Sequence, residues 1–382
     1  MRTAHIIYKN YLKPDGNGMS IGGVQTYLAN LVVVLQELGY SVIIYQRGDI
    51  NFQKSLGNNL MVNGYARPAA RVKGLSKMLY RHTKEQIDPD RGDILIFGCE
   101  SFAIEANFRV KSFAIQHGIS WDIPKEGLTR IQTLYWYLKK QYYSCKTASR
   151  VKVVDHLICV DCNFLNWYKA LVPCPQVSLH YIPNFSIVPE LCPTKPDPKN
   201  GINIIFARRF EKYRGTRLFL SVIQKLLTER NDLNITIAGD GPDEKVLKEG
   251  LETFPHVRFI RYQSQESLLI HADKHIAVVP TLGSEGTSLS LLEAMASGCA
   301  VVCTNVGGMT NVVIDGYNGL LVTPGKDELY LALKRLIINH SERNSIANRG
   351  YDTVRLSFSI DKWKSSWKSV LGKNDNPFLF NQ

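Results

Sequence analysis

Short apolar runs alternate with amphipathic helical segments along the first half of the chain. Apolar runs at 3–8 and 41–45 flank a helical pattern over 24–38, and Gly39 follows that pattern as a helix stop. Three later runs, at 94–97, 112–115 and 156–160, have the length of strands. Strands separated by helices predict right-handed β-α-β crossovers and a parallel sheet.

The same alternation restarts after a proline-rich segment. Five prolines lie between positions 183 and 198, and no periodic segment survives among them, so we expect a linker there. Beyond it, the pattern predicts strands at 202–207, 234–238, 257–260, 276–279, 300–304 and 319–322, and helices at 216–229, 243–251, 289–296 and 360–370. The two halves together therefore predict two doubly wound α/β domains. Such sheets bind ligands in a cleft at the carboxyl ends of their strands.

The length of the chain agrees with this division. A single hydrophobic core stops growing at ~250–300 residues, and the chain has 382. We predict an N-terminal domain over 1–184, a linker over 185–200, a C-terminal domain over 201–356, and a final helix and tail over 357–382. Trp363 and Trp367 lie four positions apart, so they share one face of that helix.

The composition is that of a folded protein, with 45% apolar and 21% charged residues, which excludes a disordered chain. No apolar run approaches the ~20 residues that span a bilayer, and we expect a cytoplasmic protein. The eight cysteines are scattered, and several lie in apolar runs, so we interpret them as reduced core residues. Cys159 and Cys162 form a lone C-x-x-C that lacks the further ligands of a zinc site.

Positive charge is concentrated in the first half of the chain. Residues 1–190 carry 22 Lys and Arg against 14 Asp and Glu, and the whole chain has a net charge of +12. Two stretches there are basic and contain no acid: Arg67, Arg71, Lys73, Lys77, Arg81 and Lys84 in the first, and Arg130, Lys139, Lys140, Lys146, Arg150 and Lys152 in the second. Aromatic residues interleave the second stretch, a mixture that suits an anionic membrane surface. The alternatives are a solvated helix face and a surface that recognises a substrate. We expect no nucleic-acid partner, since the chain has no recognised base-reading motif.

Two carboxylates in the second half have a suggestive spacing. Glu285 lies in the loop that opens a predicted helix, and Glu293 lies two turns inside that helix, so one ligand could span both along the helix edge. The helix start also presents free backbone N–H groups and a positive dipole end, which suit a phosphate. The alternative is that Glu285 is a solvated loop acid and Glu293 a structural acid.

The segment from Glu285 to Gly298 resembles the E-x7-E motif of the retaining glycosyltransferases of family 4, which have the GT-B fold. The similarity to the family motif extends beyond the two acids to the residues around them, Glu-Gly-Thr-Ser-Leu through Leu-Glu-Ala-Met-Ala-Ser-Gly. A strand-to-helix turn further upstream also resembles the family, with Arg209 and Arg214-Gly215 at the places of an Arg and a Lys-Gly pair. Arg replaces Lys there, but a guanidinium also binds phosphate. Two cations in such a turn can converge on one diphosphate.

The first half resembles the family at two further places. Gly22 and Gly23 lie between the first strand and the first helix, where paired glycines let the backbone approach a ligand. His117 follows the strand 112–115, so it lies at a carboxyl end and faces the cleft. A dinucleotide fingerprint starting at Gly16 is excluded, because position 21 is Ile rather than the required third glycine.

The resemblance implies a GT-B fold whose C-terminal helix returns to the N-terminal domain, and it implies roles for particular residues. Catalytic roles are implied for Glu285, His117, Arg209 and Arg214. Donor binding is implied for Gly22, Gly23, Arg209, Arg214, Gly239, Arg261, Tyr262, Gly286, Thr287, Ser288, Leu289 and Glu293. In this scheme Glu293 binds ribose hydroxyls and Glu285 binds sugar hydroxyls, while Arg261 and Tyr262 pack against the base.

The function implied is a retaining transfer of a hexose from a UDP- or GDP-linked sugar to a saccharide acceptor. We expect no cofactor and no metal, because two arginines supply positive charge at the diphosphate. A lipid-linked oligosaccharide of bacterial lipopolysaccharide, O-antigen or capsule is the expected acceptor, with peripheral contact to an anionic membrane. A phosphorylase on the same fold and a catalytically silent sugar-nucleotide-binding scaffold are the alternatives.

Overall fold

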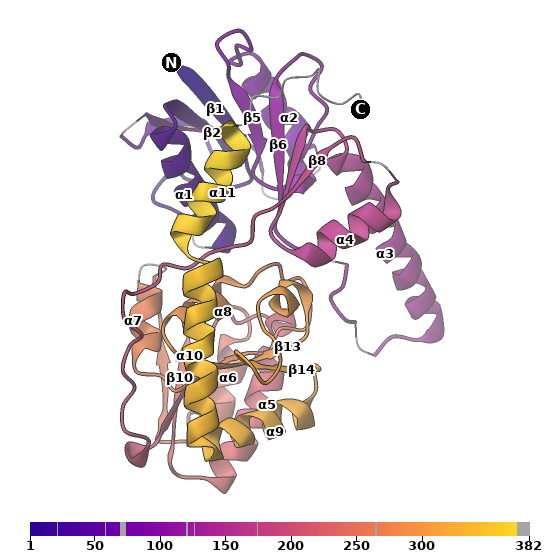
Figure 1. Cartoon of the computed structure of the whole chain (residues 1–382). Coiled ribbons are helices and arrows are strands. Elements are labelled where there is room, and N and C mark those ends of the chain that lie inside the picture. The colour runs from indigo at the N-terminus through magenta and orange to yellow at the C-terminus, as the bar shows by residue number, and fades with distance from the viewer. Residues whose placement is uncertain are drawn as a thin grey trace.

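The strands of the chain form two sheets, one in each half of the sequence (Figure 1). The computed structural model describes residues 1–20, 22–57, 59–68, 74–119, 121–125, 127–173, 175–263 and 266–372. Arg71 and Lys73 of the first basic stretch and the tail from 373 onward lie outside these ranges. Within the described residues, no helix has both the length and the apolar character needed to cross a bilayer.

The first sheet has the strand order β3-β4-β2-β1-β5-β6-β7-β8 over the described residues. Its strands are β1 (Arg2–Ile7), β2 (Tyr40–Gly48), β3 (Phe52–Ser55), β4 (Leu60–Ala66), β5 (Ile94–Phe97), β6 (Lys111–Gln116), β7 (His156–Cys159) and β8 (Ser178–Tyr181). Its helices are α1 (Gly23–Glu37), α2 (Leu75–Lys84), α3 (Arg130–Val151) and α4 (Cys162–Leu171). The β3–β4 hairpin was not predicted, and β3 runs antiparallel to β4 at the sheet edge. The prediction of a wholly parallel sheet is therefore wrong at this edge.

The second sheet is parallel throughout its described pairings, with the order β11-β10-β9-β12-β13-β14. Its strands are β9 (Ile202–Ala207), β10 (Leu233–Ala238), β11 (Val257–Ile260), β12 (Ile276–Val279), β13 (Ala300–Thr304) and β14 (Leu320–Val322). The accompanying helices are α5 (Thr216–Glu229), α6 (Glu244–Leu251), α7 (Ser267–Ala272), α8 (Leu289–Ala296), α9 (Lys326–Ile338) and α10 (His340–Ser357). Helices α9 and α10 were not among the predicted elements.

Each sheet is buried on both faces, which explains the continuous apolar runs in the sequence. All four residues of β5 and all four of β12 are buried. Separate apolar clusters cover the two faces of each sheet. Cys159, Cys299 and Cys303 are buried in these clusters, as predicted for core residues. The prediction is wrong for Cys145, which is exposed on α3, and for Cys99, Cys162 and Cys192, which are only half-buried.

The predicted linker lies between β8 and β9 and runs along the C-terminal domain rather than hanging free. Within it, the Lys195 ammonium donates to the carbonyl oxygens of His271 at 3.2 Å, Ala272 at 2.9 Å and Ser297 at 2.5 Å. These carbonyls lie at the carboxyl ends of α7 and α8, where helices leave acceptors unpaired and a cation is favoured. One lysine therefore ties the linker to two helices that border the cleft.

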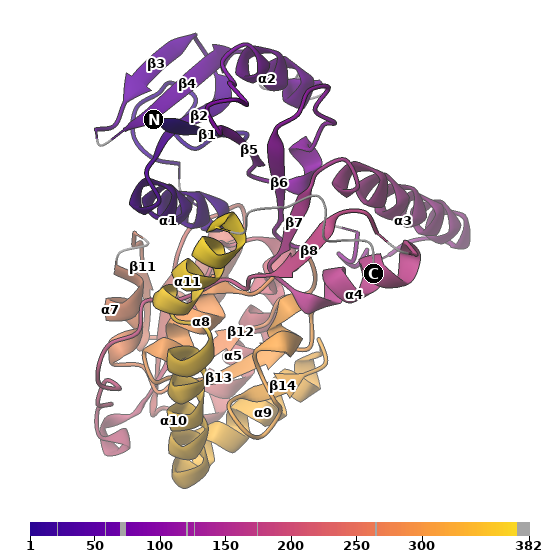
Figure 2. The same ribbon diagram turned by 45° about the horizontal axis from the view of Figure 1, so that its top comes forward.

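The final helix, α11 (Ile360–Gly372), returns to the N-terminal domain as the resemblance implied. Figure 2 shows α10 along the C-terminal domain and α11 beside α1. The Trp367 indole donates to the Tyr27 hydroxyl at 2.9 Å, and both side chains are buried. Trp363 packs on Tyr27 and on Phe185, with ring centroids 5.0 and 4.4 Å apart. The two tryptophans therefore share one buried face, as predicted.

Replacing Trp367 by Ala should lower the free energy of unfolding by about 3–5 kcal/mol, because it leaves a cavity beneath α11 and an unpaired Tyr27 hydroxyl. The measurement is urea unfolding followed by far-UV circular dichroism. Ser369→Ala is the matched control, since Ser369 is exposed on the same helix and should change stability by less than about 0.5 kcal/mol. Equal stability of both variants would contradict a docked α11.

Candidate active site

A cavity of about 580 Å³ lies at the carboxyl ends of the strands, between the two sheets. All of the residues to which a catalytic or donor-binding role was assigned line it. They come from the start of α1, the residue after β6, the turns after β9, β10 and β11, and the loop that leads into α8 together with α8 itself. The fold thus brings together side chains that are more than 250 positions apart in the sequence, from Gly22 to Glu293.

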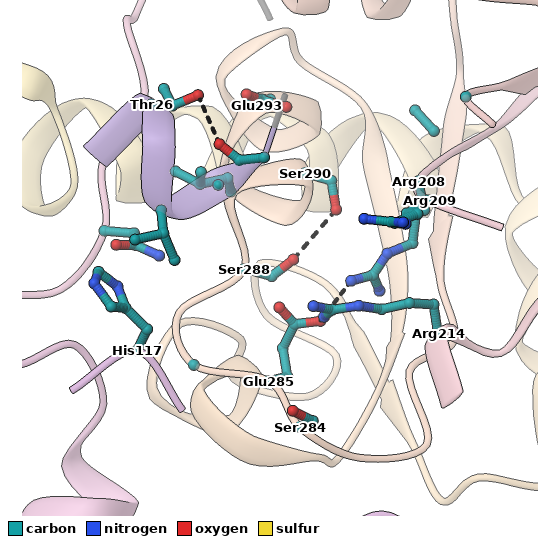
Figure 3. Close-up of a pocket in the computed structure, with 18 of the residues that line it drawn as sticks. Thr26, His117, Arg208, Arg209, Arg214, Ser284, Glu285, Ser288, Ser290 and Glu293 are labelled. Atoms are coloured by element: carbon teal, nitrogen blue, oxygen red, sulfur yellow. Dashed lines mark hydrogen bonds and ion pairs between the residues drawn. The ribbon is translucent and has the colours of Figure 1, made fainter. Parts of the chain in front are cut away.

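Glu285 is the centre of a buried ion cluster (Figure 3). Its Oε2 atom accepts hydrogen bonds from the guanidinium groups of Arg208 and Arg214, and also from the Thr281 hydroxyl at 3.0 Å. Burial by itself would raise the pKa of the Glu285 carboxyl, but the charges of Arg214 and Arg208 outweigh it and lower the pKa to about 2. One carboxylate shared by two guanidiniums leaves one positive charge in excess, and that excess faces the cavity.

The structure changes which arginine pairs with Arg214. Arg209, the predicted partner, lines the cavity, but its side chain is 66% exposed and pairs with Glu211 at 3.3 Å. Arg208 has a side chain only 5% exposed and is the one that meets Arg214 at Glu285. Consecutive side chains at the end of a strand point to opposite sides, so a shift of one residue moves the charge away from the cluster.

Gly239 allows the Arg208 turn to approach the neighbouring strand. Its φ is +136°, and a Cβ atom there would lie 2.1 Å from the Arg208 carbonyl oxygen. Any other residue would push the end of β9 away from the end of β10. Gly239 therefore serves the site by positioning Arg208, in addition to lining the cavity.

The loop that carries Glu285 also makes the contact between the two domains. Ser284 has a left-handed φ of 58°, and its N–H donates to the Asp122 carboxylate of the N-terminal domain at 2.9 Å. The Thr287 hydroxyl donates to the Val160 carbonyl oxygen. A Cβ atom at Gly286 would lie 2.7 Å from the His117 carbonyl oxygen, so only glycine permits this approach. The domains thus meet through backbone and side-chain atoms beside the ion cluster, and Asn163 adds a further contact to the Gly307 carbonyl oxygen at 2.7 Å.

Two helix N-termini face the cavity from opposite domains. Gly22 and Gly23 begin α1, and Ser288 and Leu289 begin α8. A Cβ atom at Gly23 would lie 3.2 Å from Leu289 Cδ1, which shows how closely the two helix ends approach. The first N–H groups of a helix lack intrahelical acceptors and carry partial positive charge. Together with the excess charge of the arginines, they make this end of the cavity suited to an anion.

His117 lies on the N-terminal wall of the cavity and is neutral near pH 7. Burial lowers its pKa to about 4, and the hydrogen bond from its ring to the Gly98 carbonyl oxygen offsets only part of this effect. Its Nε2 atom lies 2.9 Å from that oxygen, which can only accept, so Nε2 carries the proton and Nδ1 is an acceptor. The Tyr27 ring contacts the imidazole edge-on, with centroids 5.1 Å apart, and fixes its orientation.

Glu293 and Tyr262 also line the cavity, and both are buried enough for their pKa values to change. Burial raises the pKa of the Glu293 carboxyl, and the charge of Glu293 in turn contributes to the raised pKa of Tyr262, after burial. The Arg261 side chain turns outward, 72% exposed, and pairs with Glu244 on α6 at 3.0 Å. Tyr262 is thus the better placed of the two for packing against a planar group. Among the residues that the structure describes, no three His, Cys, Asp or Glu side chains gather in a metal-binding group.

Several lining residues were not singled out from the sequence. Besides Arg208, they include Thr26, Asn184, Asp240, Ser284 and Ser290. The Asn184 amide donates to the Thr287 carbonyl oxygen at 2.6 Å, which links the end of the first domain to the loop of Glu285. Arg208 could have been found from the sequence, because it directly follows the strand predicted at 202–207 and so lies at a carboxyl end that borders the cleft. Small polar residues such as Ser290 carry no comparable signal.

Replacing Glu285 by Ala should lower the free energy of unfolding by about 3–5 kcal/mol, because it leaves the buried Arg208 cation without a partner beside Arg214. Urea unfolding followed by far-UV circular dichroism measures the change. Arg209→Ala is the control, since it removes an exposed charge from the same turn and should cost less than about 0.5 kcal/mol. A larger loss from Arg209→Ala than from Glu285→Ala would contradict the assigned cluster.

The second half of the chain matches a known family of proteins. Residues 192–353 match the model of the family described as glycosyl transferases group 1. An uncharacterized glycosyltransferase of Methanocaldococcus jannaschii is 22% identical over 92% of this chain and 93% of its own. A phosphatidyl-myo-inositol mannosyltransferase of Mycolicibacterium smegmatis is 31% identical over a third of each chain.

Solved structures match nearly the whole chain. Sucrose-phosphate synthase from Thermosynechococcus elongatus superposes with a TM-score of 0.78 at 14% identity, over 97% of this chain and 98% of its own. Anabaena HepE in complex with UDP-glucose gives a TM-score of 0.70 at 14% identity, over 97% of this chain and 100% of its own. The chain therefore has the two-domain GT-B fold, and its residues 192–353 are similar to the glycosyl transferases group 1 family.

Proposed function

We propose that the chain is a retaining glycosyltransferase that moves a hexose from a nucleotide-diphosphate sugar to a hydroxyl of a saccharide acceptor. The observation that carries this proposal is the anion-binding end of the cavity, where Arg208, Arg214 and two helix N-termini converge beside Glu285. The HepE structure, whose fold the chain shares, is a complex with UDP-glucose. A nucleotide sugar combines the groups that such a cavity suits: a diphosphate, a ribose and a hexose.

The diphosphate would lie against Arg208, Arg214 and the N–H groups at the starts of α1 and α8. Arg209, at the exposed rim, would contribute long-range attraction rather than a direct contact. Glu293 would accept hydrogen bonds from the ribose hydroxyls. Tyr262 would pack against the base.

The hexose would lie between Glu285 and His117. None of the three donors at Glu285 contacts Oε1, so that oxygen can accept from a sugar hydroxyl. His117 Nδ1 can accept from another, because the Gly98 contact holds the Nε2 proton on the far side of the ring. Both groups are fixed before the sugar arrives, Glu285 by ion pairs and His117 by its ring contacts.

In the proposed reaction the bond between C1 of the hexose and the β-phosphate oxygen breaks, and a bond from C1 to the acceptor oxygen forms on the same face. The departing phosphate oxygen takes the proton of the acceptor hydroxyl, so the nucleoside diphosphate leaves protonated and no protein base is required. Negative charge grows on the β-phosphate as the bond breaks, and Arg208 and Arg214 stabilise that charge. Because these guanidiniums supply the cation, we propose that the transfer needs no metal.

A thermal-unfolding panel of UDP-, GDP-, ADP- and dTDP-sugars in excess chelator tests the donor site. One nucleotide should raise the midpoint temperature, since a ligand that binds only the native state at 100 times its Kd stabilises it by about 2.7 kcal/mol. Arg214→Gln should remove most of the shift, because it takes a cation from the diphosphate site and leaves the Arg208–Glu285 pair in place.

Arg217→Gln is the control for this panel, since Arg217 is exposed on α5 and pairs with Asp243 outside the cavity lining. No shift with any nucleotide, but a shift with inorganic phosphate and sugar phosphates, would replace the transferase with a phosphorylase. A shift that appears only after Mg²⁺ or Mn²⁺ replaces the chelator would overturn the metal-independent mechanism alone.

We further propose that the acceptor is held at an anionic membrane, as a lipid-linked oligosaccharide of a bacterial surface glycan (lipopolysaccharide, O-antigen or capsule) would be. Helix α3 supports this, because one face of it is apolar and exposed: Ile131, Leu134, Tyr135, Leu138 and Tyr142, each between 58% and 83% exposed. Basic residues of the second stretch flank this face, and α3 contains no acid. Figures 1 and 2 show α3 at the outer edge of the N-terminal domain, next to α4.

Flotation with vesicles of phosphatidylcholine and phosphatidylglycerol tests the membrane contact. Leu134→Gln with Leu138→Gln should lower the bound fraction about tenfold, because it removes apolar side chains from the inserting face. Leu269→Gln with Leu331→Gln is the matched control, since these leucines are exposed on α7 and α9 of the C-terminal domain. Equal flotation of both pairs, or binding insensitive to salt, would contradict a contact through α3.

A further inference from the structure

A second cavity, of about 270 Å³, lies in the N-terminal domain between residues 121–125 and α3. Its size is near the lower limit of ~300 Å³ for small-molecule sites. Its walls are basic and aromatic, formed by Trp121, Ile123, Lys125, Trp136, Lys139, Lys140 and Tyr143. None of these residues received a role in the donor site.

The lysines of this cavity lie close together, and the Asp122 carboxylate lies near Lys140. Burial raises the pKa of Asp122, and the charge of Lys140 offsets part of that effect. The ammonium groups of Lys125 and Lys139 lie 5.0 and 4.6 Å from the centroid of the Trp136 ring, which attracts both. Within the described part of the chain, neither of them nor Lys140 forms a salt bridge. Like charges gathered in this way repel one another, and a bound anion would relieve the repulsion.

The second cavity adjoins the loop that carries Glu285. Asp122, between the lining residues Trp121 and Ile123, accepts the Ser284 N–H at 2.9 Å. A Cβ atom at Gly283 would lie 2.7 Å from the Ile123 Cα, so the same loop packs directly on the cavity wall. A ligand here would therefore lie next to the expected position of the hexose.

We propose that this cavity binds a phosphate group of the acceptor. A phosphate presents several strongly accepting oxygens to three ammonium groups, and lysine binds it as a point charge. Trp121 and Tyr143 leave apolar ring surface for the sugar or lipid carbon attached to that phosphate. The proposal rests on the proposed function, because only a transferase has an acceptor to place beside the donor. It identifies the acceptor as a sugar phosphate or a phosphate-linked lipid.

Calorimetric titration with inorganic pyrophosphate in low salt tests this site. The titrations use the Arg214→Gln background, in which the anion site for the donor is weakened. Lys139→Gln with Lys140→Gln should weaken binding about tenfold or more, since each lysine contributes a charged hydrogen bond. Lys146→Gln with Lys152→Gln should change it less than about twofold, because it removes the same charge from α3 and from the residue that follows it, both outside the cavity.

Equal weakening by the two lysine pairs, or unchanged binding in both, would overturn the proposal, because the anion would then respond only to surface charge. Circular dichroism and the unfolding midpoint confirm that each variant is folded. The vesicle assay then separates the two sources of phosphate. Flotation lost by Lys139→Gln with Lys140→Gln, but kept by the control pair, assigns the site to a lipid phosphate. Equal flotation assigns it to a soluble sugar phosphate.

The nucleotide panel keeps this proposal distinct from the proposed function. Lys139→Gln with Lys140→Gln should leave the thermal shift with the donor nucleotide unchanged, since neither residue lines the donor cavity. A normal nucleotide shift with no selective effect on pyrophosphate rejects the acceptor site alone. Selective pyrophosphate binding without any nucleotide shift rejects the transferase, and with it the description of this anion as an acceptor.

Discussion

The cleft of this protein depends on one buried carboxylate shared by two arginines. Removing Glu285 from water is unfavourable, and so is removing Arg208, so neither would be stable there without the other. Arg208 follows β9, Arg214 ends the turn before α5, and Glu285 lies in the loop before α8. The cluster therefore fixes two strand-to-helix connections, β9 to α5 and β12 to α8, at the same edge of the sheet. It also leaves an excess of positive charge at the place where a diphosphate would lie.

The contact between the domains follows from the same loop. Gly286 lies against the His117 carbonyl, and Ser284 is held in a left-handed conformation by Asp122. The loop that supplies Glu285 to one domain is thereby positioned by the backbone and side chains of the other. A change in the relative position of the domains would move the carboxylate relative to His117, so both domains must be in place before the cavity has its full set of groups.

Helix α3 connects the two proposed interactions of the N-terminal domain. Its apolar face, with Leu134 and Leu138, points to solvent, while Trp136, Lys140 and Tyr143 line the second cavity. A lipid-linked acceptor has an apolar chain, a phosphate and a sugar in that order. The apolar face of α3 would match the apolar chain, and the basic cavity would match the phosphate. The cavity adjoins the loop of Glu285, where the sugar would lie. The arrangement thus gives each part of such an acceptor a chemically matched surface.

The sequence by itself determined the alternation of strands and helices, and it indicated many of the residues that line the first cavity, although not the buried Arg208. These features are periodic or local: parallel strands buried on both faces appear as apolar runs, and Glu285 and Glu293 lie on one loop and helix. It also placed Trp363 and Trp367 on one face of the last helix. The β3–β4 hairpin was not predicted, because β3 is a strand of four residues at the sheet edge and Asn63-Gly64 interrupts the apolar run of β4.

Only the tertiary structure decided which of two neighbouring arginines enters the ion cluster. Arg208 and Arg209 are adjacent and chemically equivalent in the sequence. The register of β9 against β10 determines that Arg208 is buried and Arg209 is exposed. The second cavity is likewise invisible in the sequence, because residues 121–125 and α3 become neighbours only when the chain folds. Periodicity reports which residues are buried, but contacts between distant segments depend on packing, which no local pattern encodes.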